Sequence, residues 1–91
     1  ELEVTMLAQL DDVIRYGEGI IDRVMLDNFA LDVLRTAVER NHGKFATEAS
    51  GGVTLATVRA IAETGVDFIS IGAITHSVKG FDISLEIEEE P

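Results

Sequence analysis

The sequence has few or none of the residues that mark several common protein classes. Of its 91 residues none is cysteine or tryptophan, one is proline, and seven are lysine or arginine. Without cysteine the chain cannot build a disulfide framework or a thiolate metal site, which fits a reducing compartment. It also contains no apolar run near the roughly 20 residues that cross a bilayer. We therefore expect a fold without disulfides and without a membrane span.

Charge of one sign dominates the chain. Seventeen acidic residues against seven basic ones give a formal net charge of −10. Such a charge repels a phosphate backbone and anionic lipid, so nucleic acid and membrane surfaces are not expected as partners. Hydrophobic residues make up 46% of the chain, which is normal for a globular domain and too high for a disordered acidic tail.

Apolar residues alternate between helical and extended spacing along the chain. Leu7, Leu10, Val13 and Ile14, for example, fall on one face of a helix. The spacing predicts strands over residues 2–6, 23–26, 44–49 and 67–71, and helices over 7–16 and 29–40. A third helix is expected from a Thr54 cap to Gly65, and a short helical turn near residues 75–79. Residues 41–43 are expected to form a left-handed helix cap.

This order of elements predicts an α/β fold. Strands that alternate with helices, β-α-β-α-β-α-β, are typical of parallel strands with right-handed crossovers. Residues 82–88 add a short, half-exposed C-terminal strand. A closed β/α barrel takes roughly 200–250 residues, so four strands of this kind make a partial (half) barrel. An open flavodoxin-like sheet is the alternative, and there consecutive strands would not all be neighbours.

Acidic residues stand where ligands bind in such folds, at the carboxyl ends of the strands. Glu3, Asp27 and Glu48 occupy or precede three of these ends. Carboxylates there can hold Mg²⁺ or accept hydrogen bonds from a sugar diol. Asp27 could instead belong to a turn, and Glu48 could form an ion pair inside the barrel with Lys44 or Arg59.

Two glycine-containing turns follow the third and fourth strands. The turn Ser50-Gly51-Gly52 precedes the expected Thr54 helix cap, and Gly72 precedes the expected helical turn. Free N–H groups at a helix start favour a phosphate, although the glycines could serve only to make tight turns. His76 could act as a general acid or donate to a phosphate, or merely fill the loop.

Three segments carry a family resemblance. They are TEASGGVTL at residues 47–55, TGVDFISIGAITHSVK at 64–79 and DISL at 82–85, preceded in order by LEV at 2–4 and MLDN at 25–28. This series resembles the C-terminal part of the barrel domain of quinolinate phosphoribosyltransferase, also called nicotinate-nucleotide pyrophosphorylase (carboxylating). The resemblance implies that residues 1–91 are the C-terminal segment of the barrel, without the N-terminal domain and the early barrel strands.

The resemblance also implies a reaction. Family members condense quinolinate with phosphoribosyl pyrophosphate, using Mg²⁺, and form nicotinate mononucleotide, CO₂ and pyrophosphate for NAD synthesis. They work as homodimers in the cytoplasm, or in plastids in plants. The implied roles are Mg²⁺ and ribose binding by Glu3 and Asp27, phosphate binding by Ser50, Gly51, Gly52 and Gly72, and lining of the same mouth by Glu48 and His76.

An inactive piece is the other possibility. The family binds the two carboxylates of quinolinate with a cluster of arginine and lysine, which comes from sequence not found in this chain. We therefore expect the 91 residues to be inactive alone. The alternative is an excised or engineered half-barrel that serves as an assembly module and pairs its open sheet edges with another copy.

Overall fold

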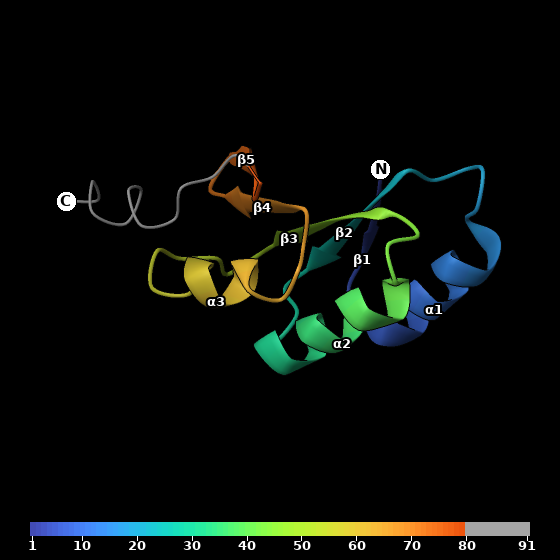
Figure 1. Cartoon of the computed structure of the whole chain (residues 1–91), viewed down its shortest axis with the longest axis horizontal. Coiled ribbons are helices and arrows are strands. Elements are labelled where there is room, and N and C mark those ends of the chain that lie inside the picture. Colours follow the sequence, from blue (N-terminus) through green and yellow to red (C-terminus); the bar gives the residue numbers. More distant parts are fainter. Residues whose placement is uncertain (80–91) are drawn as a thin grey trace.

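The computed structural model describes residues 1–79, which form a five-stranded sheet and three helices (Figure 1). In chain order the elements are β1 (Leu2–Val4), α1 (Leu7–Tyr16), β2 (Arg23–Asp27), α2 (Leu31–Asn41), β3 (Ala46–Ser50), α3 (Val58–Ala62), β4 (Phe68–Ile71) and β5 (Ile74–Ser77). The strand expected over 82–88 lies outside the described residues. Within residues 1–79, no helix has the length and apolar character that a membrane crossing needs.

The strands lie in the sheet in the order in which they occur in the chain. The sheet order is β1-β2-β3-β4-β5, with β1 to β4 parallel and β5 antiparallel to β4. This order confirms the parallel β/α array, and the flavodoxin-like alternative is wrong. Right-handed crossovers between successive neighbours place every connecting helix on one face, and Figure 1 shows α1, α2 and α3 on the same side of the strands.

The hydrophobic core lies between the sheet and these helices. Helix α1 has the predicted bounds, and its Leu10 and Val13 face inward. Val24 and Leu26 alternate along β2 toward the same side, as the two-residue period of a strand requires. Residues of every strand from β1 to β4 and of all three helices join this core: Val4, Leu10, Val13, Val24, Leu26, Leu34, Ala37, Phe45, Ala49, Val58, Ala62, Val66 and Ile69.

Helix α2 ends at the predicted cap. His42 adopts a left-handed conformation with φ 49°, and its N–H donates to the carbonyl of Val38. Asn41 beside it is 4% exposed, and its side-chain amide both donates to the Phe45 carbonyl and accepts from the Phe45 N–H. The amide therefore satisfies the backbone groups of Phe45, the residue that precedes β3.

Helix α3 is shorter than predicted, and Thr54 is not its cap. The helix begins at Val58, and its N-cap position, Thr57, makes no side-chain capping bond. The Thr57 hydroxyl instead accepts a 3.1 Å hydrogen bond from the Thr54 N–H. Local side-chain to backbone bonds of this kind compete with helix formation. A turn over residues 54–57 therefore separates the glycine turn from the helix.

The helical turn expected over residues 75–79 is wrong as well. Residues 74–77 form β5, which pairs antiparallel with β4 through a tight turn at Gly72 and Ala73. Gly72 has a φ of +64°, which a glycine adopts without strain. The β-branched residues Ile74 and Thr75 that follow favour an extended strand.

Candidate functional site

The carboxyl ends of β2 and β3 bring two predicted site residues together. Asp27 and Ser50 are the last register pair of this ladder, and the Ser50 hydroxyl donates a 3.1 Å hydrogen bond to Asp27 Oδ1. The Asn28 N–H donates to the Ser50 carbonyl over 2.7 Å. Asp27 and Ser50 are both partly exposed. The protein therefore orients the Asp27 carboxylate and still leaves it open to a ligand.

The glycine turn after β3 packs directly against this carboxylate. Gly51 has a φ of +79°, and a Cβ placed on it would lie 2.8 Å from Asp27 Oδ1 and 3.0 Å from the Asn28 nitrogen. Gly52 has a φ of +68°. Backbone conformation and lack of space thus each require glycine at position 51, and the turn brings main-chain atoms close to Asp27.

A cavity of about 260 Å³ adjoins the outer side of the turn. Its lining includes Asn28, Phe29, Gly51, Gly52, Thr57 and Ile61. It lies between the turn and the starts of α2 and α3. Because α3 begins at Val58, six residues after Gly52, its first turn does not adjoin the glycines in the chain as predicted.

Glu3 lies on the same face of the sheet as Asp27 but farther from the carboxyl ends of the strands. It is the register partner of Met25, two residues before Asp27, and it is exposed. Adjacent strands and a two-residue offset put the Cα atoms of Glu3 and Asp27 on the order of 8 Å apart. The two carboxylate side chains lie on one face and can both approach an ion or diol placed between them.

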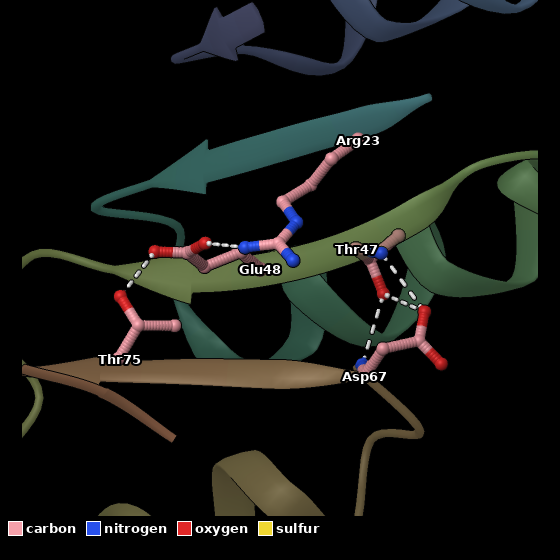
Figure 2. Close-up of polar contacts among 5 residues, drawn as sticks. All are labelled: Arg23, Thr47, Glu48, Asp67 and Thr75. Carbon is pink, nitrogen blue, oxygen red and sulfur yellow. Dashed lines mark hydrogen bonds and ion pairs between the residues drawn. The ribbon is translucent and has the colours of Figure 1, made fainter. Parts of the chain in front are cut away.

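Glu48 lies deeper on this face, and partners occupy both of its carboxylate oxygens. The residue is 2% exposed. Arg23 Nη1 donates to Oε1 over 3.1 Å, and the Thr75 hydroxyl donates to Oε2 over 3.2 Å, as Figure 2 shows. A buried carboxylate is tolerated only when it is paired and hydrogen-bonded, and this arrangement meets that condition.

Arg23 completes the cluster by stacking. Its guanidinium carbon lies 3.8 Å from the ring centroid of Phe68, which is the register partner of Glu48 on β4. Four strands thus each contribute one side chain to the same face: Arg23 from β2, Glu48 from β3, Phe68 from β4 and Thr75 from β5. We call these four residues the inner-face cluster.

The interior ion pair of Glu48 was predicted with the wrong partner. Lys44 is hydrogen-bonded to the Ile14 carbonyl instead, and Arg59 is exposed on α3, which covers the other face of the sheet. The real partner, Arg23, stands at the start of β2. Its polar side chain at the head of an apolar strand was the one available signal in the sequence.

The structure places the last two predicted site residues, Gly72 and His76, in different environments. Gly72 is exposed in the β4–β5 turn, and a Cβ there would meet nothing within 4 Å. His76 is the register partner of Ile69, a core residue of the helix-covered face, whereas its neighbour Thr75 contacts Glu48. Because register partners share a face, the structure does not bring His76 to the side of the sheet where Glu48 lies.

The metal-ligating potential of the described chain is limited. Among residues 1–79 no three His, Cys, Asp or Glu side chains gather closely enough to hold a metal ion. Glu3 and Asp27 still offer two oxygen-donor groups on one face. Mg²⁺ is commonly held by one or two carboxylates, with water and substrate oxygens as its other ligands, so this pair fits that ion.

Comparisons with known proteins agree with one another. Residues 1–86 match the family model described as "Quinolinate phosphoribosyl transferase, C-terminal domain". The chain is 45% identical to a chloroplastic nicotinate-nucleotide pyrophosphorylase [carboxylating] of Arabidopsis thaliana over 99% of its length, and 40% identical to a probable enzyme of that name from Bacillus subtilis over 96%. These matches cover 29% of each relative, so the chain spans less than a third of their length.

Solved structures show the same likeness. The nicotinate-nucleotide pyrophosphorylase of Francisella tularensis superposes with a TM-score of 0.69 and 47% identity, over 82% of this chain and 26% of that one. The protein of that name from Ehrlichia chaffeensis gives a TM-score of 0.71 and 37% identity, over 77% and 24%. These likenesses support the predicted partial barrel.

Proposed function

We propose a function that starts from one premise: this chain belongs to the quinolinate phosphoribosyl transferase family, as part of its C-terminal domain. In the proposed reaction, quinolinate and phosphoribosyl pyrophosphate give nicotinate mononucleotide, CO₂ and pyrophosphate in NAD synthesis. The chain would form the side of the active site that binds the phosphoribosyl donor. The family match over residues 1–86 favours this function over that of an assembly module without activity.

The observation that carries the proposal is the unit formed by Asp27, Ser50 and Gly51 at the carboxyl ends of β2 and β3. A carboxylate oriented by a hydroxyl and lying against a positive-φ glycine is suited to a ligand that has both a diol and a phosphate. Asp27 and Glu3 would accept hydrogen bonds from the ribose hydroxyls. The same pair would hold Mg²⁺, which neutralises charge on the pyrophosphate when it is bound.

In this proposal the Ser50-Gly51-Gly52 turn and the Gly72 turn bind phosphate. The Ser50 hydroxyl and the backbone N–H groups of Gly51, Gly52 and Gly72 are the donors that we assign to it. Main-chain donors at glycine turns can approach an anion closely because no side chain intervenes. The short α3 adds little to this binding, since the 54–57 turn separates it from the glycines.

In the reaction, the bond between the anomeric carbon and pyrophosphate breaks and the quinolinate nitrogen forms the new bond. Positive charge develops on the ribose ring as the pyrophosphate leaves. The carboxylates of Glu3 and Asp27 would lie on the face where that charge is stabilised. Loss of the neighbouring carboxylate as CO₂ leaves an electron pair on the ring carbon, and a proton from water then gives the nicotinate product. The basic groups that would bind the carboxylates of quinolinate lie outside this chain. The chain alone would therefore not catalyse the reaction.

Further properties follow as proposals from family membership. A homodimer and a location in the cytoplasm or in a plastid are proposed. Plant relatives described as chloroplastic or mitochondrial support an organellar location for the plant branch. We do not assign ligand contacts to Glu48, because it is buried and both of its oxygens accept from Arg23 and Thr75. Nor do we assign them to His76, which lies on the other face of the sheet.

A titration of the 91-residue chain tests the donor site directly. Phosphoribosyl pyrophosphate and Mg²⁺ are added while the amide signals of the glycines are followed by NMR. Gly51, Gly52 and Gly72 should shift. Gly43, another positive-φ glycine at the opposite end of β3, should not. No shift at millimolar donor, or equal shifts at Gly43 and Gly51, would overturn the proposed function.

A further inference from the structure

Both oxygens of the Glu48 carboxylate accept hydrogen bonds from the protein itself. Arg23 donates to one oxygen and Thr75 to the other, and the residue is 2% exposed. At this level of burial, little of the carboxylate is open to a ligand. The geometry is instead that of a group that joins parts of the protein.

The parts that it joins are not adjacent in the sheet. Strand β4 lies between β3 and β5, and Phe68 on β4 pairs with both Glu48 and Ser77. The hydrogen bond from Thr75 to Glu48 therefore passes over β4 and links β3 to β5 (Figure 2). The sheet must curl at this point for two strands separated by a third to come within side-chain reach.

Both ends of this link lie at the base of a glycine turn. Glu48 stands two residues before Ser50, and Thr75 stands three residues after Gly72. The backbone pairing of β3 with β4 ends at Ala49 and Ile69, before the two turns begin. Glu48 lies within that pairing, and its side-chain bond to Thr75 adds a direct tie between the two strands that carry the turns.

Arg23 fixes the direction of the link. Its guanidinium is hydrogen-bonded to Glu48 and stacked at 3.8 Å on Phe68, so both an edge and a face of the planar group have partners. Because stacking on Phe68 fixes the plane of the guanidinium, the hydrogen bond from Nη1 also limits rotation of the carboxylate. The inner-face cluster thus holds Oε2 toward β5.

We propose that Glu48 is a positioning residue that sets the separation between the Ser50-Gly51-Gly52 turn and the Gly72 turn. The effect on turn separation needs no assumption about the ligand. Its consequence for catalysis rests on the proposed function, in which both turns bind phosphate groups of one donor. Turns held at a fixed separation bind such a donor without first being ordered.

A conservative pair of variants at Thr75 tests the separation without ligand. Thr75→Val removes the hydroxyl and keeps the β-branched shape, whereas Thr75→Ser keeps the hydroxyl. Since the chain has no cysteine, one can be introduced at exposed Ala73 to carry a spin label. Relaxation of the Gly51 and Gly52 amides by the label then reports how close the two turns lie.

Thr75→Val should change this relaxation and Thr75→Ser should restore it. Glu48→Met, which removes both contacts at once, should change it in the same direction. Relaxation equal to that of the unsubstituted chain in both Thr75→Val and Glu48→Met would overturn the inference. Urea unfolding of each protein verifies that the label reports on a folded chain.

Donor binding provides the second measurement. With phosphoribosyl pyrophosphate and Mg²⁺, Thr75→Val should bind more weakly, by at most about five-fold, because the full free energy of one hydrogen bond within the protein is the upper limit of the effect. Thr75→Ser should recover the affinity. Unchanged affinity in Thr75→Val would contradict the catalytic consequence. If the unsubstituted chain binds no donor, the proposed function fails, and the spin-label result still decides the positioning role.

Discussion

Asp27 and Ser50 form the last register pair of β2 and β3, and the Ser50 hydroxyl donates to the Asp27 carboxylate over 3.1 Å. Gly51 follows at once and leaves no room for a Cβ beside the same carboxylate oxygen. Three parts of the structure are therefore coupled by direct contact: the end of β2, the Asp27 carboxylate and the glycine turn after β3. A substitution in any of the three should change the geometry of the other two.

Gly51→Ala should destabilise the protein by about 2 kcal/mol, through both a strained φ and a contact of the new Cβ with Asp27. Urea unfolding measures the loss. Gly43→Ala is the matched control, since Gly43 has a similar φ of +74° but open space around it. The control should lose less, about 1 kcal/mol. Equal losses in the two variants would mean that the close approach to Asp27 has no energetic effect.

Asp27→Asn should weaken donor binding and leave stability nearly unchanged. The amide oxygen of asparagine can still accept from Ser50, so the local hydrogen bond is kept. The loss of negative charge removes a ligand for Mg²⁺ and should lower the affinity for phosphoribosyl pyrophosphate by about ten-fold or more. Calorimetric titration with and without Mg²⁺ measures this. If the two proteins bind alike, Asp27 has no part in the site.

Arg23→Met should destabilise the protein by about 2 kcal/mol, because it leaves the buried Glu48 carboxylate without a cation. The side chain of Arg23 is 33% exposed, which keeps the effect below that of a fully buried pair. The double variant Arg23→Met with Glu48→Met should recover part of the loss. A double-mutant cycle from urea unfolding measures the coupling, and purely additive effects would contradict the pairing.

Asn41→Asp should destabilise the protein by about 2 kcal/mol, because a carboxylate cannot donate to the Phe45 carbonyl and is costly at a site that is 4% exposed. Thermal unfolding at neutral pH compares it with the unsubstituted chain. Asp32→Asn, at an exposed position near the start of α2, is the surface control and should change stability little. Wild-type stability in Asn41→Asp would show that another donor satisfies Phe45.

The elements that the sequence predicted well are those with a long, one-sided apolar pattern. Helix α1 and the cap after α2 were predicted at the right residues because Leu10 and Val13 repeat at helical spacing and His42-Gly43 permits a left-handed turn. The pairing of Asp27 with Ser50 was accessible for a similar reason. Parallel strands end at one edge, so residues that follow successive strands meet there.

Errors arose where short-range polar bonds or long-range register decided the outcome. The Thr54–Thr57 turn delays α3, and the apolar spacing of that segment does not reveal it. Arg23 and Glu48 are 25 residues apart, and only the register of β2 and β3 brings them together. The hairpin at Gly72 puts Thr75 and His76 on opposite faces, which a helical turn would not have done.

The antiparallel β5 makes the two borders of the sheet unlike each other. A strand added beside β1 could continue the parallel ladder that runs through β4. A strand of the same direction added beside β5 would have to pair antiparallel with it. Among the described strands, the parallel array can therefore be extended beside β1 but not beside β5.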